Sequence, residues 1–282
     1  MNVLEEVVKN IRAELEPIYG RRESEAIIRL IFFHLKGWNL TDMLVNNREE
    51  LSPFILEEIN KIVVRLKNYE PIQYITGIAR FHGLDLKIAP GVLIPRPETE
   101  ELVDIIIREN YEREDLEILD IGTGSGAIAV SLARSLKFPR ITAIDFSEQA
   151  LEIARKNADS LKVKISFVRK DILKEKIEGR YDIIVSNPPY VTEREKTGME
   201  RNVLDFEPIT ALFVADDNPL LFYKKILEIA SYSLVEKGRI YLEINPLFAS
   251  DLKRLIISKG YEDVDIIRDS FGKERFIRAT KI

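Results

Sequence analysis

The sequence predicts an α/β fold with a mostly parallel sheet, preceded by a smaller helical region. Three observations lead to this prediction. From residue 98 onward, segments with helical spacing alternate with short apolar runs typical of buried parallel strands. A glycine-rich turn follows the first of these runs, and the first 70 residues show helical spacing alone. Because the chain has 282 residues, its length predicts two domains, or one large one.

Residues 1–70 are expected to form a bundle of three or four short helices. Gly37-Trp38-Asn39 interrupts the apolar spacing, and a new helix is expected to begin at Leu40. Ser52 and Pro53 indicate a further helix start, since serine caps helix N-termini and proline is favoured at the first helical position.

Two proline-rich stretches delimit a linker, which we place at residues 71–95. The first is Pro71–Gly77 and the second is Pro90–Pro97. Between them, residues 80–88 alternate in polarity, which predicts a β-hairpin around Gly83. The remaining residues, 96–282, would form the second domain.

This second domain is expected to alternate helices and strands to near its end. The expected helices are 98–109, 126–136, 147–157, 220–234 and 247–258. The expected strands are 116–121, 140–145, 163–168, 181–186, 239–244, 261–268 and 275–280. Repeated βα units predict helices on both faces of a parallel sheet. The last two strands lack a helix between them, which predicts one antiparallel strand.

The composition excludes several classes of protein. The absence of cysteine excludes disulfides, thiolate metal sites and a cysteine nucleophile. The chain has no apolar run long enough to span a membrane and no basic, apolar start like that of a signal peptide, so a cytoplasmic location is expected. A net charge of −5 argues against a broad, non-specific nucleic-acid binder.

The tetrapeptide Asn187-Pro188-Pro189-Tyr190 directly follows the predicted strand 181–186. Because proline has no N–H donor, two prolines cannot continue a central strand, so the chain must leave the sheet at its carboxyl edge. Open α/β folds bind their ligands at this edge. Asn187 and Pro188 offer carbonyl oxygens there and Tyr190 offers a ring. Such groups could hold a planar –NH2 group; the alternative is a strand-ending turn with a stacked tyrosine.

A glycine-rich turn, Asp120–Gly126, joins the first strand of the second domain to its helix. Its spacing is tighter than that of dinucleotide sites. Asp145 ends the next strand, where it could bind both hydroxyls of a ribose or cap the following helix, a role also open to Ser147. Asp171 follows the next strand and could bind an adenine amino group or lie in a solvated turn. Asp120 suits a cationic ligand, so S-adenosylmethionine fits this turn better than NAD.

In this order, the glycine-rich turn, Asp145 and the tetrapeptide resemble class I S-adenosylmethionine-dependent methyltransferases that act on an amide or exocyclic amine. Three further segments are similar to the HemK/PrmC family, the glutamine-N5 methyltransferases of translation release factors. These segments are Pro71–Gly77, Pro90–Glu100, and Phe206-Glu207-Pro208 with Ala211-Leu212. The resemblance extends from the N-terminal helices to near the C-terminus, and Pro90–Glu100 is much more specific than the tetrapeptide.

The resemblance implies a Rossmann-like class I methyltransferase fold, with a mixed seven-stranded sheet and a separate N-terminal helical domain. It implies S-adenosyl-L-methionine as cofactor, S-adenosyl-L-homocysteine as product, and no metal. The substrate would be the glutamine of a Gly-Gly-Gln loop in class-1 peptide-chain release factors. The implied cofactor-binding residues are Gly122, Thr123, Gly124, Ser125, Gly126, Asp145, Asp171, Ile172 and Asn187. The implied substrate-binding residues are Asn187, Pro188, Pro189 and Tyr190, and of these Asn187, Pro188 and Tyr190 would be catalytic.

A mechanism follows from this arrangement. We expect Asn187 Oδ1 and the Pro188 carbonyl each to accept one N–H of the glutamine amide, while Tyr190 packs against it. The sequence offers no obvious general base, because His34 and His82 are expected to be structural. The helical domain is expected to dock the release factor, since a lone glutamine side chain offers little specificity.

Two other functions remain open at this point. A DNA adenine-N6 methyltransferase would also act on a conjugated –NH2 group, but it must flip a base and usually has a basic cleft. A domain that only senses S-adenosylmethionine would not need an intact Asn-Pro-Pro-Tyr motif. We therefore expect no membrane partner and no direct sequence-specific nucleic-acid binding.

Overall fold

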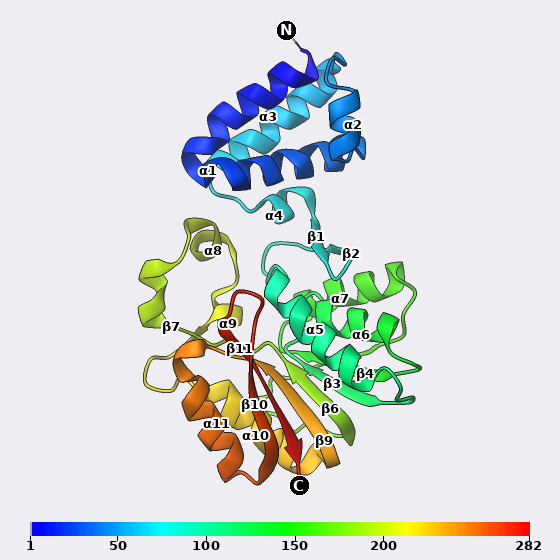
Figure 1. The fold of residues 1–282 in the computed structure, drawn as a ribbon, viewed down its shortest axis with the longest axis vertical. Coiled ribbons are helices and arrows are strands. Elements are labelled where there is room, and N and C mark those ends of the chain that lie inside the picture. The colour runs from blue at the N-terminus through cyan, green and yellow to red at the C-terminus, as the bar shows by residue number, and fades with distance from the viewer. Residues whose placement is uncertain (1) are drawn as a thin grey trace. The chain divides into compact units, whose positions relative to one another are not determined.

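The chain divides into two compact units in a computed structural model that describes residues 2–282. The first unit comprises the chain up to Gly77 together with Glu200–Phe206, and the second comprises Ile78–Met199 and Glu207–Ile282. Each unit has its own hydrophobic core. Figure 1 shows the first unit as helical and the second as a sheet with helices on both faces.

The first unit confirms the predicted helical bundle. Its helices are α1 (Leu4–Lys36, interrupted by non-helical Gly20), α2 (Leu40–Val45), α3 (Pro53–Lys67), α4 (Ile72–Thr76) and α8 (Arg201–Phe206). Helix α2 begins where expected, and Asn39 caps it by accepting from the backbone of Thr41 and Asp42. Ser52 caps α3 by accepting from Ile55 N, and Pro53 is the first residue of that helix.

Two helices of this unit lie outside the expected elements. Helix α4 falls in the proline-rich stretch, and α8 comes from far along the chain, where no element was expected. The guanidinium of Arg201 lies 4.3 Å from the ring centre of Tyr69, which adds a cation–π contact between α8 and the bundle. Helix α8 was missed because it is short and has no local pattern that associates it with the bundle.

The predicted hairpin opens the second unit. Strands β1 (Ile78–Phe81) and β2 (Leu84–Lys87) are antiparallel, with Phe81 opposite Leu84. The two residues of the turn, His82 and Gly83, both have positive φ, at 48° and 71°. This is the left-handed conformation that a tight two-residue hairpin turn requires, and glycine adopts it without strain.

The second unit is built on a mixed seven-stranded sheet in the order β10-β11-β9-β6-β3-β4-β5. The strands are β3 (Glu117–Ile121), β4 (Arg140–Asp145), β5 (Ser166–Arg169), β6 (Tyr181–Ser186), β9 (Leu234–Glu243), β10 (Tyr261–Arg268) and β11 (Glu274–Lys281). Neighbouring strands from β5 to β9 are parallel, and β11 is antiparallel to both its neighbours. The predicted single antiparallel strand is therefore confirmed.

Helices cover both faces of this sheet, as predicted (Figure 1). They are α5 (Pro97–Asn110), α6 (Ala127–Ser135), α7 (Glu148–Ser160), α10 (Leu221–Ser233) and α11 (Ala249–Ser258). Successive strand residues contribute to opposite cores, because side chains alternate along a strand. Ile118 packs in the core that includes α5 and α6, whereas Leu119 packs in the core that includes α10 and α11.

The chain differs from the sequence expectations mainly after the Asn-Pro-Pro-Tyr tetrapeptide. Besides α8, residues 191–214 form β7 (Val191–Thr192), a short 3-10 helix η1 (Glu193–Gly198), α9 (Ile209–Leu212) and β8 (Phe213–Val214). Strand β9 begins at Leu234 rather than at residue 239, because Leu234 already pairs with Tyr181 before a break in register. A 3-10 turn η2 (Pro246–Phe248) precedes α11.

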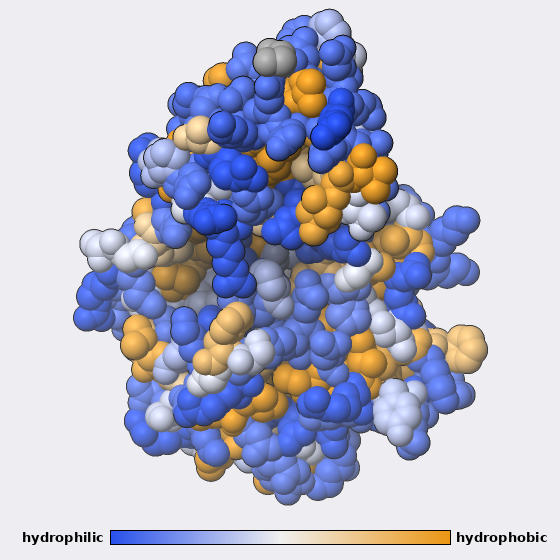
Figure 2. Space-filling view, turned by 45° about the horizontal axis from the view of Figure 1, so that its top comes forward, coloured by the Kyte–Doolittle hydropathy of each residue, from blue (hydrophilic) through white to orange (hydrophobic). Residues whose placement is uncertain are grey.

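On the face that Figure 2 shows, hydrophilic side chains predominate and apolar side chains occur in separate groups. Across residues 2–282, the structure contains no helix that is both long and apolar enough to cross a membrane.

Candidate active site

The carboxyl ends of β3, β4 and β6 are joined directly by hydrogen bonds. The backbone N–H groups of Gly122 and Thr123 donate to Ile144 O at 2.9 and 3.0 Å. The hydroxyl of Ser186 donates to Ile121 O at 2.7 Å. Since parallel neighbours end at the same edge, the glycine-rich turn, Asp145 and the tetrapeptide all begin at this edge of the sheet.

The glycine-rich turn leaves its backbone open to a ligand. Gly122 and Gly124 have φ values of +73° and +55°, and a Cβ added at either would meet nothing within 4 Å. Gly126 also has a positive φ, but a Cβ there would lie 3.0 Å from the Cβ of Ala154. The first two glycines thus allow close approach of a bound group, and the third allows α6 to approach α7.

Asp145 is held against the glycine-rich turn. One of its carboxylate oxygens accepts from Gly124 N at 2.9 Å and the other from Ser147 N at 2.9 Å. Helix α7 is capped by Ser147, whose hydroxyl accepts from Ala150 N at 3.3 Å. The cap that was the alternative role for Asp145 is therefore supplied by Ser147. Each Asp145 oxygen retains a lone pair that could accept from a ribose hydroxyl.

Asp120 lies buried under the glycine-rich turn and is incompletely paired. Its Oδ2 accepts from Thr123 Oγ1 at 2.6 Å, while its Oδ1 has no hydrogen-bond partner among the described residues. Burial raises the pKa of Asp120 to about 7, although the hydrogen bond from Thr123 opposes the rise. A buried acid with a free oxygen beside an open loop fits a cationic group, as the sequence suggested.

The raised pKa of Asp120 predicts a dependence of stability on pH. The folded protein binds this proton more tightly than the unfolded chain, so the stabilisation is complete below the ordinary value of 3.8 and is lost as the pH rises through about 7. In the wild type, the free energy of unfolding should therefore fall by roughly 2–3 kcal/mol between about pH 5 and pH 8 through this group. Replacing Asp120 with asparagine should abolish that fall. Urea unfolding of both proteins without cofactor, at both pH values, measures this difference. Equal pH dependence in the two proteins would show that Asp120 does not titrate in this range.

Asp171 and Ile172 follow β5, the strand next to β4. Lys170 N donates to Asp145 O at 2.9 Å, which brings the exit of β5 to that of β4. The carboxylate of Asp171 accepts from Leu173 N at 3.0 Å and pairs with Lys174 at 2.8 Å. Ile172 is half-buried against the core beneath the sheet edge. Asp171 is therefore engaged within its own turn, and its contact with adenine stays a prediction.

The tetrapeptide Asn187–Tyr190 leaves the sheet at the end of β6, as two prolines require. Asn187 Nδ2 donates to Thr99 Oγ1 at 3.2 Å, so its Oδ1 is the atom that remains for a ligand. Pro188 is buried and Pro189 is half-buried. The hydroxyl of Tyr190 donates to Glu243 Oε1 at 2.9 Å, and its ring packs on the core.

Three residues around the tetrapeptide were not among the predicted site residues. Thr99 and Glu243 bind Asn187 and Tyr190 as described, and Asn245 Nδ2 donates to Tyr190 O at 3.1 Å. Glu243 ends β9, the parallel neighbour of β6. The rule that selected Asp120 and Asp145, an acid at the carboxyl end of a strand, could have selected Glu243 too. Thr99 lies within the Pro90–Glu100 element but has no such local signal.

Comparison with known proteins identifies the family. Residues 6–77 match the PrmC N-terminal domain and residues 100–204 match the methyltransferase small domain. The chain is 48% identical to a release factor glutamine methyltransferase of Bacteroides thetaiotaomicron, over 96% of this chain and 98% of that protein. The protein of the same description from Flavobacterium psychrophilum is 40% identical over the same shares.

The chain belongs to the release factor glutamine methyltransferase family. A more distant member from Bacillus subtilis is 36% identical over 92% of each chain. The resemblance on which the sequence analysis relied is therefore confirmed.

Solved structures agree with the fold of this family. A methyltransferase from Pyrococcus furiosus aligns with a TM-score of 0.53 and 25% identity, over 71% of this chain and 90% of that one. A 16S rRNA N2 G1207 methyltransferase from T. thermophilus, solved with AdoMet and guanosine, aligns with a TM-score of 0.52 and 18% identity, over 73% of this chain and 50% of that one. The chain has the class I S-adenosylmethionine-dependent methyltransferase fold.

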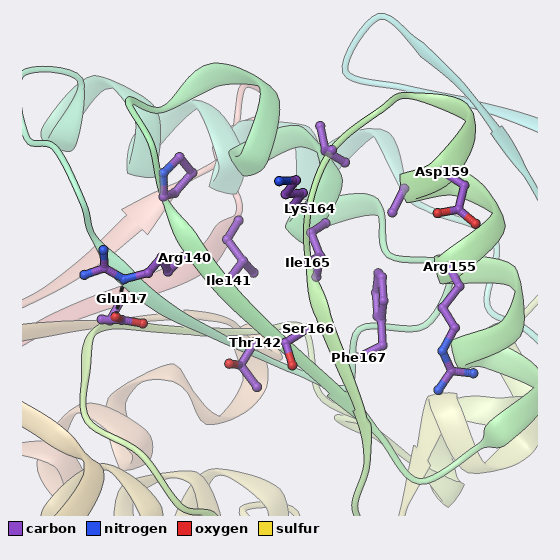
Figure 3. Close-up of a pocket in the computed structure, with 13 residues that line it drawn as sticks. Glu117, Arg140, Ile141, Thr142, Arg155, Asp159, Lys164, Ile165, Ser166 and Phe167 are labelled. Carbon is purple, nitrogen blue, oxygen red and sulfur yellow. Dashed lines mark hydrogen bonds and ion pairs between the residues drawn. The ribbon is translucent and has the colours of Figure 1, made fainter.

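An open hollow lies apart from the residues predicted for the family's site. It is formed around Arg140–Thr142 at the start of β4 and Lys164–Phe167 at the start of β5, with Arg155 and Asp159 from α7 (Figure 3). None of the predicted site residues lines it. Arg140 at its edge is already paired with Glu117. Because open α/β folds bind ligands at the carboxyl edge, we do not assign this hollow to the reaction.

Proposed function

We propose that this protein transfers a methyl group from S-adenosyl-L-methionine to the side-chain amide nitrogen of the glutamine in the Gly-Gly-Gln loop of class-1 peptide-chain release factors. The observation that carries the proposal is the near-full-length similarity to proteins described as release factor glutamine methyltransferases. The Asn187 amide at the sheet edge supports it, because its free Oδ1 suits a substrate N–H.

The residues at the glycine-rich turn fit the proposed cofactor. Gly122–Gly126 would line it with open backbone, Asp145 would accept from its ribose hydroxyls, and the Asp171-Ile172 turn would lie by its adenine. The unpartnered Oδ1 of Asp120 supports a cationic ligand in this place. When bound, S-adenosyl-L-methionine supplies a methyl carbon, which bonds to the glutamine nitrogen as the carbon–sulfur bond breaks to leave S-adenosyl-L-homocysteine.

The residues of the tetrapeptide would prepare the substrate amide. A carboxamide nitrogen is a poor nucleophile, because its lone pair is delocalised into the carbonyl. Asn187 Oδ1 and the Pro188 carbonyl would each accept one N–H and so aim the nitrogen, and Tyr190 would exclude water. Orientation of this kind supplies at most ~7–11 kcal/mol in model systems. After methyl transfer the nitrogen would carry a positive charge and be strongly acidic, so it would release its extra proton to water.

Mass spectrometry of a purified class-1 release factor after incubation with this protein and S-adenosyl-L-methionine tests the proposal. We expect one added methyl group, located on the glutamine of the Gly-Gly-Gln loop. In a parallel reaction with labelled cofactor, duplex DNA should stay unlabelled. Label on adenine instead of the release factor would support an adenine-N6 methyltransferase, and label on neither would support a sensor.

The helical unit is proposed to dock the release factor away from its reacting loop. Four large apolar side chains around α2 and the start of α3 are exposed, namely Leu40, Leu44, Val45 and Phe54. Val45 is 75% exposed and Leu44 is 66% exposed, so neither is needed for the core of the unit. Contiguous exposed apolar surface is typical of a protein contact, and these four side chains come from one short helix and the start of the next.

Replacing both Leu44 and Val45 with serine should therefore weaken binding of the intact release factor. We expect KM to rise roughly 30-fold, since the two lost apolar contacts contribute about 1 kcal/mol each, while kcat stays unchanged. Steady-state kinetics with the intact factor measures both constants. Replacement of Ile257, an exposed residue of α11, with serine is the matched control. An unchanged KM in the double variant would exclude this patch as the docking surface.

A further inference from the structure

Glu243 is a buried carboxyl residue that contacts Tyr190 directly and is linked to Asn187 through Thr99; Asn187 to Tyr190 form the proposed substrate clamp. Its side chain lies at the end of β9, and the residue is 1% exposed. Its Oε2 accepts from Thr99 Oγ1 at 2.7 Å and its Oε1 accepts from Tyr190 OH at 2.9 Å. Burial raises the pKa of Tyr190, which keeps that hydroxyl protonated as a donor. One carboxylate therefore takes the hydroxyl hydrogens of both neighbours.

Which atom donates and which accepts in these hydrogen bonds determines the orientation of the Asn187 side-chain amide. Thr99 and Tyr190 both donate their hydroxyl hydrogens to Glu243, and a threonine hydroxyl has a single hydrogen. Because Thr99 gives that hydrogen to Glu243, its oxygen can only accept from its other neighbour. That neighbour is Asn187, whose Nδ2 lies 3.2 Å from Thr99 Oγ1. The reversed amide would place Oδ1 against an oxygen with no hydrogen to give, which is repulsive.

We propose that Thr99 and Glu243 are positioning residues that fix the direction of the Asn187 amide, so that Oδ1 rather than Nδ2 faces the substrate glutamine. This inference rests on the proposed function and adds two residues to it. An amide side chain has nearly the same shape in both orientations, so packing alone would not choose between them. The direction is set instead by two successive hydrogen bonds, from Asn187 to Thr99 and from Thr99 to Glu243, which together we call the relay.

The position of the relay in the fold supports a role in the reaction. A buried carboxylate is costly to desolvate, and apolar side chains of similar size would pack helix α5 against β9 without that cost. Burial raises the pKa of Glu243, while hydrogen bonds from Thr99 and Tyr190 and the charge of Arg275 oppose the rise. The side-chain hydrogen bonds of this buried group go to Tyr190 itself and to Thr99, the residue that holds Asn187.

Replacing Thr99 with valine tests the relay, because valine keeps the shape and removes the hydroxyl. We expect kcat on the release factor to fall roughly 10- to 100-fold, since the amide loses its preferred direction. KM for the release factor and the calorimetric Kd for the cofactor should change less than about twofold. Thr99→Ser restores the hydroxyl and should restore most of kcat. Thr280→Val, at a buried threonine near the opposite end of the sheet, is the matched control.

A second measurement follows the amide without any substrate. In nitrogen-15 NMR spectra, assigned by comparison with Asn187→Asp, the Asn187 side-chain amide signals should shift in Thr99→Val and not in Thr280→Val. A wild-type kcat in Thr99→Val, with the wild-type enzyme active on release factor, would overturn the inference. Unshifted Asn187 signals would overturn it as well. If the wild type does not methylate release factor but the signals shift as expected, the proposed function fails and the relay stands.

Discussion

Replacing Asn187 with alanine should lower kcat on a class-1 release factor by roughly 10²–10³-fold. The physical reason is the loss of one preorganised acceptor from the clamp, by analogy with the loss of one preorganised donor from an oxyanion site. In the structure, Nδ2 of this residue is held by Thr99 and Oδ1 is left for the substrate. Single-turnover methylation with saturating cofactor, read by mass spectrometry of the release factor, measures the effect on the chemical step.

The controls for this prediction separate chemistry from folding and cofactor binding. Asn68→Ala removes an asparagine whose Nδ2 donates only to the α3 backbone carbonyl of Val64, and it should keep normal kcat. Calorimetry of the cofactor Kd of Asn187→Ala separates the two implied roles of this residue: a Kd within about threefold of the wild type would assign it to the substrate clamp alone, and a larger rise would add a contact with the cofactor. Near-normal turnover by Asn187→Ala would show that the proposed mechanism is wrong.

Replacing Asp145 with alanine should chiefly weaken cofactor binding, by roughly 10- to 100-fold in Kd. A hydrogen bond to a charged group contributes about 1.5–3 kcal/mol, so the expected change corresponds to the net loss of one such bond with ribose. The substitution also frees Gly124 N, which now donates to Asp145 at 2.9 Å and so shapes the glycine-rich turn. Isothermal titration calorimetry with S-adenosyl-L-methionine measures the change in Kd.

Asp145→Asn serves as the companion variant, because it keeps acceptor oxygen and side-chain size while removing the charge. It should bind cofactor more tightly than Asp145→Ala and more weakly than the wild type. Asp171→Ala tests whether the neighbouring acid contributes, since that side chain already pairs with Lys174 in its own turn. Unchanged cofactor affinity in Asp145→Ala would refute the ribose assignment.

Much of the fold could be predicted because its signals are local. The helix start at Leu40 was marked by the interruption Gly37-Trp38-Asn39, the start at Pro53 by its capping residue Ser52, and the hairpin by a glycine at a turn. Strand β6 has the predicted bounds, since its apolar run ends at two prolines that cannot pair. The segment 191–214 was not predicted, because its elements are short and lie between motifs with no periodic pattern of their own.

The residues of the candidate site were likewise predictable where a local motif marks them. The glycine-rich turn, Asp145 and Asn187 each follow a predicted strand, so a parallel sheet brings them to one edge without further information. Thr99 and Glu243 were missed, although Thr99 lies in a segment already singled out. Their roles depend on contacts across 88 and 53 positions of sequence to Asn187 and Tyr190, which no local pattern reveals.

The sequence alone was enough to predict the α/β class, the family and the polar atoms available to a ligand at the sheet edge. These features depend on strand ends, helix caps and short motifs, each of which involves only residues close together in the sequence. Only the folded chain decided which way the Asn187 amide points, that Ser147 rather than Asp145 caps α7, and that Asp120 keeps an unpartnered oxygen. These features depend on which donors and acceptors meet after distant segments pack and water is excluded. A buried polar group takes its partner from the neighbours that packing supplies.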